Sequence, residues 1–337
     1  MKRVFAIDAN RVFLLSIVLS QILIYCISGF GVRDTMVLQF LVEVLMVLPA
    51  VFYLTGRQQP LKRSFGLTIP GWKEWLLLLP LAVCVDKIAE FINVLSQLIT
   101  PNVVSNHMIP LIMEYPFLVS FFVIAITPAV CEELIYRGVL FRNYRKSGIV
   151  TSVLLSGFLF GIMHMNLNQF SYAFVLGILL ALVTELTGSM LPTMFLHLYI
   201  NGRSVVVVHV VVRYLSGLRE RYVTAEAAGD TGLMESLRQM ADGVPIESAD
   251  WLECYINTEN GAIGDTILML LPGFLTAVAV TIVVFKLLLR LRKKKEEAGM
   301  LSVELQDEKE EKGGWRTVAS PELLIGIVFC IVFMLFR

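Results

Sequence analysis

The sequence is poor in charge, since only 17% of its 337 residues are Asp, Glu, Lys or Arg, whereas 56% are hydrophobic. Acids and bases are equal in number, 28 of each, so the chain has no basic excess of the kind that binds nucleic acid. Soluble domains carry about 25% charged residues. The composition therefore excludes an ordinary soluble domain and predicts a polytopic, all-α membrane protein without a nucleic-acid partner.

Cysteine and histidine are also scarce. The chain has only four histidines, and its cysteines are scattered with no Cys-x-x-Cys spacing. Such a pattern predicts small core residues and not a disulfide framework or a zinc cage. The His-Glu-x-x-His sequence of many zinc proteases is absent as well, so we predict no bound metal and no cofactor. The five cysteines are Cys26, Cys84, Cys131, Cys254 and Cys330.

Alternation of polar and apolar residues, which a β-barrel needs, is missing, and no short internal repeat is evident. Apolar stretches of about 20 residues recur instead, and each is long enough to cross a bilayer as a helix. A ninth stretch, 323–336, is short, because its helix would reach only about 21 Å. The predicted fold is a transmembrane helical bundle of eight or nine spans. The eight longer stretches lie near 11–30, 36–55, 75–96, 116–141, 149–165, 170–187, 190–212 and 264–290.

The distribution of basic residues predicts the orientation of the bundle. Lys and Arg gather in 56–74, 142–148 and 290–295, whereas 97–115 has none and acids outnumber bases in 213–263. Because Lys and Arg accumulate in short cytoplasmic loops, the N-terminus is predicted to lie in the cytoplasm. We expect an integral membrane protein in the plasma membrane of a prokaryote.

Three polar segments lie outside the spans. Lys2 and Arg3 precede a first apolar run that no small-residue cleavage site follows, so we interpret that run as a retained span. Segment 213–263 is predicted to be either a small helical cap on the outer side or a flexible acidic loop. Segment 293–320, rich in Glu and Lys, is predicted to be a solvated cytoplasmic linker.

Charged residues inside one span are the most informative feature. Glu132, Glu133 and Arg137 interrupt an apolar stretch, where three ionised groups would cost roughly 8 kcal/mol, so the cluster is interpreted first as a functional site. Residues four apart share a helix face, so Arg137 is expected to pair with Glu133. Glu132 is turned away by about 100 degrees and is left free to act as a general base. The alternative is a buried ion pair that only holds helices together.

Two further polar insertions lie on later spans. His164 ends an apolar helix one turn after Phe160, and His197 and Asn201 lie four apart on one face of the next such helix but one. Single histidines near helix ends are commonly structural, but two of them lie in spans that an up-down bundle would place near the acidic helix, which favours a shared site. Counting about 1.5 Å per residue puts Glu132 about 15 Å, His197 about 11 Å and His164 about 22 Å from the inner ends of their spans. A shared site therefore requires the fifth span to tilt or to start lower.

A second charged patch lies in the third predicted span. Asp86, Lys87 and Glu90 interrupt the stretch 75–96. Charges inside a span are either paired with one another or functional. We predict structural pairing here in preference to a role in substrate entry.

These motifs resemble those of the CAAX protease and bacteriocin-processing family, also called the Abi family, which includes the type II CAAX prenyl endopeptidase. The resemblance covers about 116–205 and consists of Glu132-Glu133-x-x-x-Arg137, Phe160-x-x-x-His164 and His197-x-x-x-Asn201, with Tyr136 where the family usually has Phe. It implies a metal-independent intramembrane endopeptidase. In this family pattern Glu132 and His164 activate water, His197 and Asn201 form the oxyanion hole, and Glu133, Arg137 and Phe160 support the site.

The resemblance also suggests how the chain is organised. We predict N-terminal transmembrane helices in 1–115, a catalytic transmembrane core in 116–212, an extracytoplasmic loop or cap in 213–263, and C-terminal transmembrane helices with a charged linker in 264–337. The expected partners are the lipid bilayer and a membrane-associated or lipidated peptide or protein. The oligomeric state is not predicted.

Three alternatives to a metal-independent protease stay open. The chain could be a non-proteolytic membrane scaffold, such as an immunity or regulatory protein that keeps the fold. Glu132, His164 and His197 could instead bind zinc with a water as the fourth ligand. In a proton-coupled transporter the same groups would relay protons, although the paired, broken helices of many transporters are not evident.

Overall fold

The computed structural model describes residues 2–56, 66–241, 244–249, 251–252, 262–297 and 318–336. These residues form helices and the turns between them, and no strand occurs in these ranges. The structure therefore confirms a helical membrane bundle. The basic residues Arg57, Lys62 and Arg63, Cys254, and most of the predicted linker 293–320 lie outside the described residues.

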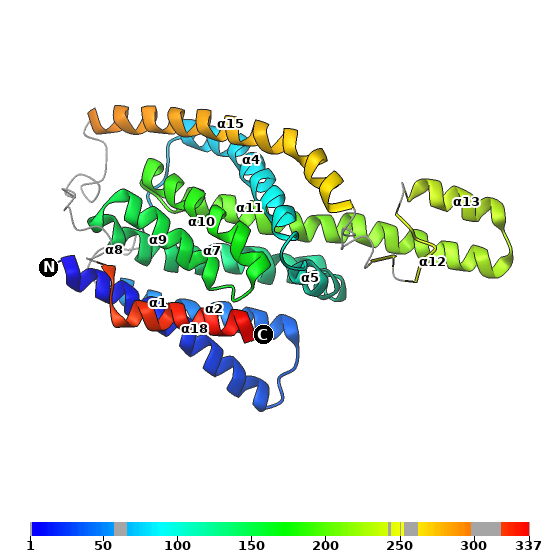
Figure 1. The fold of residues 1–337 in the computed structure, drawn as a ribbon, viewed down its shortest axis with the longest axis horizontal. Coiled ribbons are helices and arrows are strands. Elements are labelled where there is room, and N and C mark those ends of the chain that lie inside the picture. The colour runs from blue at the N-terminus through cyan, green and yellow to red at the C-terminus, as the bar shows by residue number, and fades with distance from the viewer. Residues whose placement is uncertain are drawn as a thin grey trace.

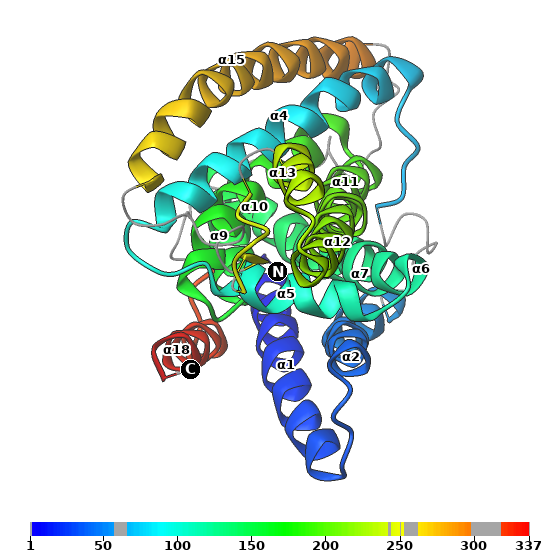
Figure 2. The ribbon, with the colours of Figure 1, turned by 90° about the vertical axis from the view of Figure 1, so that its right-hand side faces the viewer.

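The bundle has a central group of helices between two outer groups (Figures 1 and 2). On one side, α1 (Lys2–Gly29) packs against α2 (Thr35–Thr55) and α18 (Pro321–Phe336). On the other side, α15 (Ala262–Glu297) lies along α4 (Trp72–Ser96). The short α5 (Val103–Glu114) lies at the end of the bundle toward α12. The site is built in the central group, so both outer groups shield it.

The central group comprises the segments between Phe117 and Val212. They are α6 (Phe117–Ser120), η1 (Phe121–Ile126), α7 (Thr127–Glu133), η2 (Leu134–Phe141), α8 (Arg142–Tyr144), η3 (Arg145–Ser147), α9 (Ile149–Ile162), α10 (Leu167–Thr187), α11 (Leu191–Val207) and η4 (Val208–Val212). The helix pairs α9 and α10, α11 and η1, and α11 and α7 are in contact. Side chains from several segments therefore meet in one interior.

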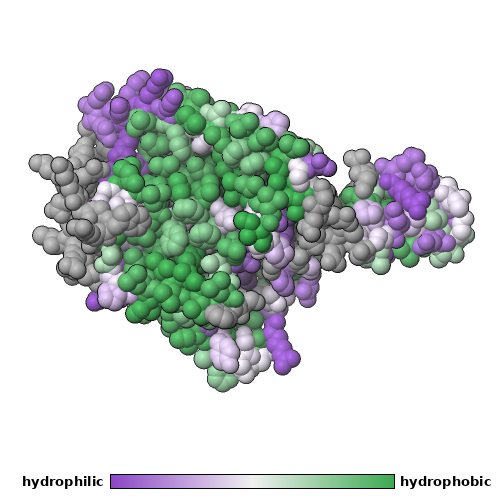
Figure 3. All heavy atoms as spheres, viewed as in Figure 1, coloured by the Kyte–Doolittle hydropathy of each residue, from purple (hydrophilic) through white to green (hydrophobic). Residues whose placement is uncertain are grey.

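Among the described residues, six helical stretches are long and apolar enough to cross a membrane. The 25-residue helix α4 is not among them because it carries five charged residues, and α9 and α18 are shorter. The predicted positions of all nine stretches agree with helices, but the count of eight or nine spans stays a prediction. Figure 3 shows apolar side chains covering most of the visible face of the bundle. The six stretches are Asp8–Gly29, Thr35–Thr55, Phe117–Ser147, Leu167–Thr187, Leu191–Ala228 and Ile263–Glu297.

Helix α7 is short because π-helical turns flank it on both sides. η1 precedes it and η2 follows it, both with the wider i→i+5 hydrogen-bond spacing. At the first junction the Thr127 hydroxyl donates to the carbonyl of Phe122, 2.9 Å away. Wide turns of this kind are frequent at functional sites. Here they bracket the helix that carries Glu132 and Glu133.

The predicted outer insertion forms a helical arm. The helix that begins with α11 continues through η4 and α12 (Arg213–Ala228), and α13 (Thr231–Met240) folds back on α12 (Figure 1). The turn between them contains Gly229, whose φ is +70°, and the Asp230 side chain caps α13 by accepting from the backbone N–H of Leu233. The described part therefore favours the helical cap over the flexible loop, although the arm projects away from the bundle.

Ion pairs join the helices at the end of the bundle that holds the N-terminus. Glu185 of α10 accepts from Arg145 at 2.8 Å and from Arg292 of α15 at 2.7 Å. Lys295 of α15 lies 2.6 Å from Glu74 of α4. These basic residues, which we used to predict the orientation, therefore also hold the helices together.

The charged patch of α4 is paired, as predicted. Asp86 accepts from Arg203 of α11 at 2.8 Å, and Lys87 lies 2.6 Å from Glu90 on the same helix. The first pair joins α4 to α11, and the second lies at the surface. Structural pairing is therefore confirmed for these residues.

Candidate active site

Glu133 is the best satisfied carboxylate of the buried cluster. Its Oε1 accepts from Arg137 Nη1 and from His197 Nδ1, each at 3.0 Å. Both Glu133 and Arg137 are fully buried. The predicted pairing of Glu133 with Arg137 is confirmed, and the bond from His197 brings α11 to the same carboxylate.

Arg137 is held from three sides. Besides Glu133, its guanidinium donates through Nη2 to the carbonyl of Gly177 at 3.1 Å and lies 4.6 Å from the centre of the Phe160 ring. Stacking on an aromatic face and a fixed carbonyl acceptor suit the planar guanidinium better than they suit a lysine. Arg137 therefore acts as a rigid bridge between α7, α9 and α10.

Three glycines allow this close approach of α9 to α10. A Cβ on Gly177 would lie 2.8 Å from the Cα of Gly157, and a Cβ on Gly161 would lie 3.0 Å from the backbone N of Phe174. Gly157 and Gly161 are four apart, the small-residue spacing that lets transmembrane helices pack closely. The contact brings the Gly177 carbonyl within reach of Arg137.

Glu132 has a different environment although it is the neighbour of Glu133. It is 5% exposed, and its Oε2 has no hydrogen-bond partner among the described residues. His197 Nε2 lies 3.8 Å from this oxygen, which is beyond a hydrogen bond. A buried carboxylate oxygen without a partner costs free energy, so such an atom is expected to have a role. Oε2 of Glu133 also has no hydrogen-bond partner among the described residues, so the two residues differ in that Glu133 is bound through Oε1 to Arg137, as predicted, and to His197.

Phe160 brings the two histidines to one place. The centre of its ring lies 5.4 Å from that of His164 and 5.7 Å from that of His197, and Phe160 is almost fully buried. His164 lies in the turn after α9, and its Nδ1 donates to the carbonyl of Phe160 at 2.9 Å. Met165 follows in a left-handed conformation with φ of +49°. Both histidine rings thus contact one ring, despite the depth difference expected between His164 and His197 from residue counting.

Asn201 lies one turn beyond His197 on α11. Its Nδ2 donates to the carbonyl of Ile124 in η1, 3.2 Å away. Gly202 permits this contact, since a Cβ there would lie 2.9 Å from the Phe121 ring. Asn201 is therefore held against a π-helical turn, and one N–H of its amide is left for another acceptor.

Sequence reasoning missed Glu43. This residue of α2 is 3% exposed, and its Oε2 has no hydrogen-bond partner among the described residues. Helix α2, which carries it, packs against both α7 and η2. The signal was available, because Glu43 is the one charged residue in the predicted span 36–55.

No group of three or more His, Cys, Asp or Glu side chains in the described ranges is placed to hold a metal ion. The zinc alternative requires Glu132, His164 and His197 to converge on one point, and they do not form such a group. The described cysteines Cys26, Cys84, Cys131 and Cys330 are free thiols.

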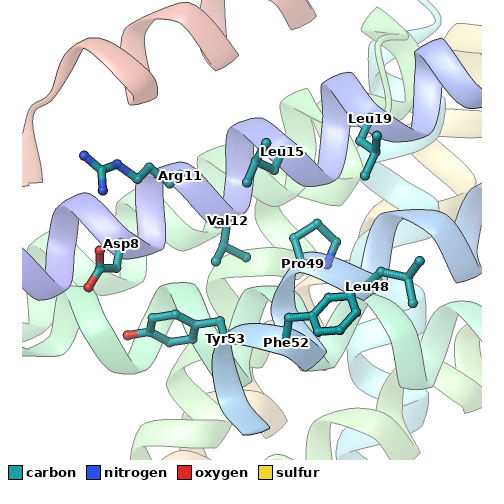
Figure 4. Close-up of a pocket in the computed structure, with 9 residues that line it drawn as sticks. All are labelled: Asp8, Arg11, Val12, Leu15, Leu19, Leu48, Pro49, Phe52 and Tyr53. Carbon is teal, nitrogen blue, oxygen red and sulfur yellow. The ribbon is translucent and has the colours of Figure 1, made fainter. Parts of the chain in front are cut away.

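A surface groove lies between α1 and α2, away from the charge cluster. It has a volume of about 590 Å³, and Figure 4 shows the residues that line it. The lining is mainly apolar, with Asp8, Arg11 and Tyr53 as its polar members. None of the predicted site residues lines it, so the groove gives no evidence on the chemistry.

Comparison with known families agrees with the position of the site. Residues 114–203 match the model of the family described as type II CAAX prenyl endopeptidase Rce1-like. A search of curated proteins found no match, and a search of solved structures found none. The matched segment contains all seven predicted site residues and excludes Glu43 and the arm. The family resemblance is thus confirmed for this segment, and at the level of the family the match supports a membrane protease.

Proposed function

We propose that the protein is an intramembrane endopeptidase in which Glu132 activates water without a metal ion. The observation that carries this proposal is the buried Oε2 of Glu132, which has no hydrogen-bond partner among the described residues and lies 3.8 Å from His197 Nε2. Glu133 cannot serve in the same way, because Arg137 and His197 already bind it.

The proposed reaction begins with a water molecule next to Glu132. The carboxylate takes a proton from the water while the water oxygen forms a bond to the carbonyl carbon of the substrate peptide. The carbonyl electron pair moves to its oxygen and creates an oxyanion. When this electron pair returns, the C–N bond breaks, and the departing nitrogen takes the proton from Glu132. The carboxylate is thereby restored.

Donors for the oxyanion come from α11. Because His197 Nδ1 donates to Glu133, its Nε2 carries a proton only when the ring is an imidazolium, and Glu133 is placed to act as the counter-ion of that cation. Asn201 adds the amide N–H that Ile124 does not use. Two donors fixed on one helix stabilise developing charge without rearrangement.

His164 assists Glu132 in this proposal. Its Nδ1 is committed to the Phe160 carbonyl, which orients the ring and leaves Nε2 for water. Phe160 separates the two histidines, and its ring lies edge-on to the ring of each histidine. The seven residues thus divide into groups for water activation, oxyanion binding and support.

The proposed substrate is a membrane-associated or lipidated peptide or protein. Prenylated CAAX proteins suit the family if the host prenylates proteins, and a bacteriocin-like or signal peptide is the expected substrate otherwise. We propose a cytoplasmic N-terminus, since the last turns of α15, which carry Arg292 and Lys295, lie at the end of the bundle where α1 begins (Figure 1). Arg145 binds the same Glu185 as Arg292 and so belongs to this end. The arm then lies outside the cell.

Cleavage by the purified full-length protein tests the proposal. The protein in detergent is incubated with a quenched peptide library that includes farnesylated CAAX peptides, with and without a chelator. We expect cleavage that survives chelation and is lost in Glu132→Gln. Glu226→Gln is the matched control, because Glu226 is exposed on α12 and distant from the bundle.

Each other result selects an alternative. Loss of cleavage on chelation, restored by added zinc, indicates a metalloprotease. Cleavage that persists in Glu132→Gln removes the proposed base. A folded wild-type protein that cleaves no peptide, lipidated or free, contradicts the protease and favours the scaffold.

A further inference from the structure

Basic side chains form a stripe along the last turns of α15. Four of them are three or four residues apart in sequence and therefore share one face of the helix. All four side chains are exposed. The members of this stripe, which we call the basic ladder, are Lys286, Arg290, Lys293 and Lys294.

The basic ladder is unpaired within the described part of the chain, where no hydrogen bond or ion pair joins any of its members to another residue. The other basic residues of these turns are used differently, because Arg292 binds Glu185 and Lys295 binds Glu74. Arg292 lies two residues after Arg290 and thus about 200 degrees further around the helix. The bundle therefore holds one face of α15, and the ladder points away from it.

The spacing of charges along α15 places the ladder at one boundary of the hydrocarbon layer. Between Asp265 and Lys286 the helix has 20 residues, and none of them is charged. At about 1.5 Å per residue they span about 30 Å, which is the thickness of the hydrocarbon core. Lys286 then lies where the core meets the polar headgroups.

The ladder is long enough to cross the whole headgroup layer. From Lys286 to Lys294 the helix rises about 12 Å, whereas the headgroups add about 5–8 Å on each side of the hydrocarbon core. Arg290, in the middle, therefore lies at the level of the lipid phosphates, and Lys286 can extend its side chain toward them. The ladder thus presents positive charge over the full depth at which phosphates occur.

The charge of this surface favours an anionic partner. Only one acid, Glu297 at the end of the helix, shares the face with the four bases. Figure 3 shows hydrophilic side chains gathered where α15 ends in Figure 1. The accumulation of bases at cytoplasmic helix ends accounts for their number, but it does not require four of them to share the face that points away from the bundle.

We propose that the basic ladder binds the phosphate groups of anionic phospholipids in the cytoplasmic leaflet. A cluster of bases beside a transmembrane helix attracts such lipids, and each base raises the binding constant about fivefold. The bound lipid would hold the outer face of α15, as Glu74 and Glu185 hold the inner face. The inference does not depend on peptidase activity, and only the choice of leaflet rests on the proposed orientation.

Lipid binding by the purified full-length protein tests the proposal. The protein in an uncharged detergent is titrated with phosphatidylglycerol or with phosphatidylcholine, and the bound lipid is counted by native mass spectrometry. We expect tighter binding of phosphatidylglycerol, and we expect this preference to weaken as the salt concentration rises. Equal binding of the two lipids overturns the proposal.

Single substitutions locate the binding. Arg290→Gln should weaken phosphatidylglycerol binding about fivefold, whereas Arg290→Lys, which keeps the charge, should stay within about twofold of the wild type. Lys73→Gln is the matched control and should also stay within about twofold, because Lys73 is an exposed base beside Glu74 and outside the ladder. Equal losses in Arg290→Gln and Lys73→Gln would assign the preference to overall charge and overturn the proposal.

Replacement of all four ladder residues by glutamine should abolish the preference for phosphatidylglycerol and leave phosphatidylcholine binding unchanged. A preference that survives this change overturns the proposal. Thermal unfolding shows whether each variant is folded, and the single variants decide if the fourfold variant is not.

The competing occupant of the ladder is the chain's own segment 301–312, which contains five acids and two lysines. A variant in which amides replace these five acids should bind phosphatidylglycerol within about twofold of the wild type. If the wild type shows no preference and this variant does, the segment occupies the ladder and the proposal is wrong.

Discussion

Glu132 and Glu133 are adjacent in the chain and both buried, yet they have different partners. Glu133 binds Arg137 and His197 through Oε1, whereas Glu132 Oε2 lies 3.8 Å from His197 Nε2, beyond a hydrogen bond; Oε2 of each residue has no hydrogen-bond partner in the described part of the chain. Glu133 thus holds helices together, and Glu132 is kept available for reaction at a cost in stability. The difference shows how a dry site can hold a reactive group, because the satisfied neighbour fixes the geometry around it.

The sharpest test of this comparison exchanges each carboxylate for an amide. Glu132→Gln should reduce peptide cleavage by about 10²- to 10⁴-fold, the usual contribution of a general base, with little loss of stability. Glu133→Gln should instead lower stability, because it leaves the Arg137 charge buried and unpaired. Single-turnover cleavage and thermal unfolding of both variants measure the two effects. If both variants lose stability equally and activity equally, the division of roles is wrong.

Replacement of Arg137 tests the structural role of Glu133 alone. Arg137→Met should destabilise the protein by about 3–5 kcal/mol, because the fully buried Glu133 loses its counter-ion. The double variant Glu133→Gln, Arg137→Met should recover part of that loss. Unfolding by denaturant in mixed micelles gives the four free energies of the cycle. Additive losses would show that the pair does not act as a unit.

The helix contact that supports Arg137 should be sensitive to a single methyl group. Gly177→Ala places a Cβ 2.8 Å from the Cα of Gly157, so we expect a loss of about 1–3 kcal/mol and weaker cleavage as the carbonyl acceptor moves. Gly217→Ala in α12 is the matched control, since no atom lies within 4 Å of the added Cβ. The control should be neutral or more stable by up to about 1 kcal/mol, as expected for alanine in a helix. Equal effects of the two substitutions on unfolding would exclude the close helix contact as the cause.

An exposed carboxylate outside the spans should give the smallest effect. At Asp34 the backbone N–H of Val37 and then the Tyr115 hydroxyl hold the pKa below its usual value, while the bond to Asp34 raises the pKa of Tyr115 to about 12. Because the pKa of Asp34 is lowered on folding, its stabilisation is present at neutral pH and is lost as the pH falls through the carboxyl range. The stabilisation that Tyr115 contributes is fully present below about pH 10 and is lost as the pH rises toward 12.

Thermal unfolding between acid and alkaline pH checks this pair. The melting temperature of Tyr115→Phe should lie slightly below that of the wild type at neutral pH. The difference between the two melting temperatures should shrink at acid pH and at alkaline pH. A difference that does not change with pH would mean that the hydroxyl contributes only through packing.

Much of the site could be predicted because it depends on spacing within single helices. The pair of Glu133 with Arg137, the freedom of Glu132 and the common face of His197 and Asn201 all follow from helical periodicity, and the structure has each of them. The roles of these residues in catalysis stay predictions. The positions of the spans followed from hydropathy for the same local reason.

Contacts between helices could not be predicted in this way. The bond from His197 to Glu133 depends on how α11 crosses α7, and the contact of Phe160 with His197 depends on how α9 is placed relative to α11. Glu43 was missed because its neighbours lie almost 90 residues away in the chain, although its isolation in an apolar span was visible. The sequence did not decide between a helical cap and a loop for 213–263, because helix α12 continues without a break until Gly229, beyond the apolar stretch that ended the predicted span.

The π-helical turns on either side of α7 have a consequence for how this protein tolerates changes in length. A π turn holds about one residue more than an α turn, so deletion of one residue within 134–141 could restore a regular helix without breaking it. Residues beyond the deletion would then rotate by about 100 degrees relative to Glu132 and Glu133, and a deletion between Glu133 and Arg137 would change their spacing from four residues to three. A relative that is shorter by one residue in this stretch should therefore keep its membrane span but lose the present alignment of η2 with α7.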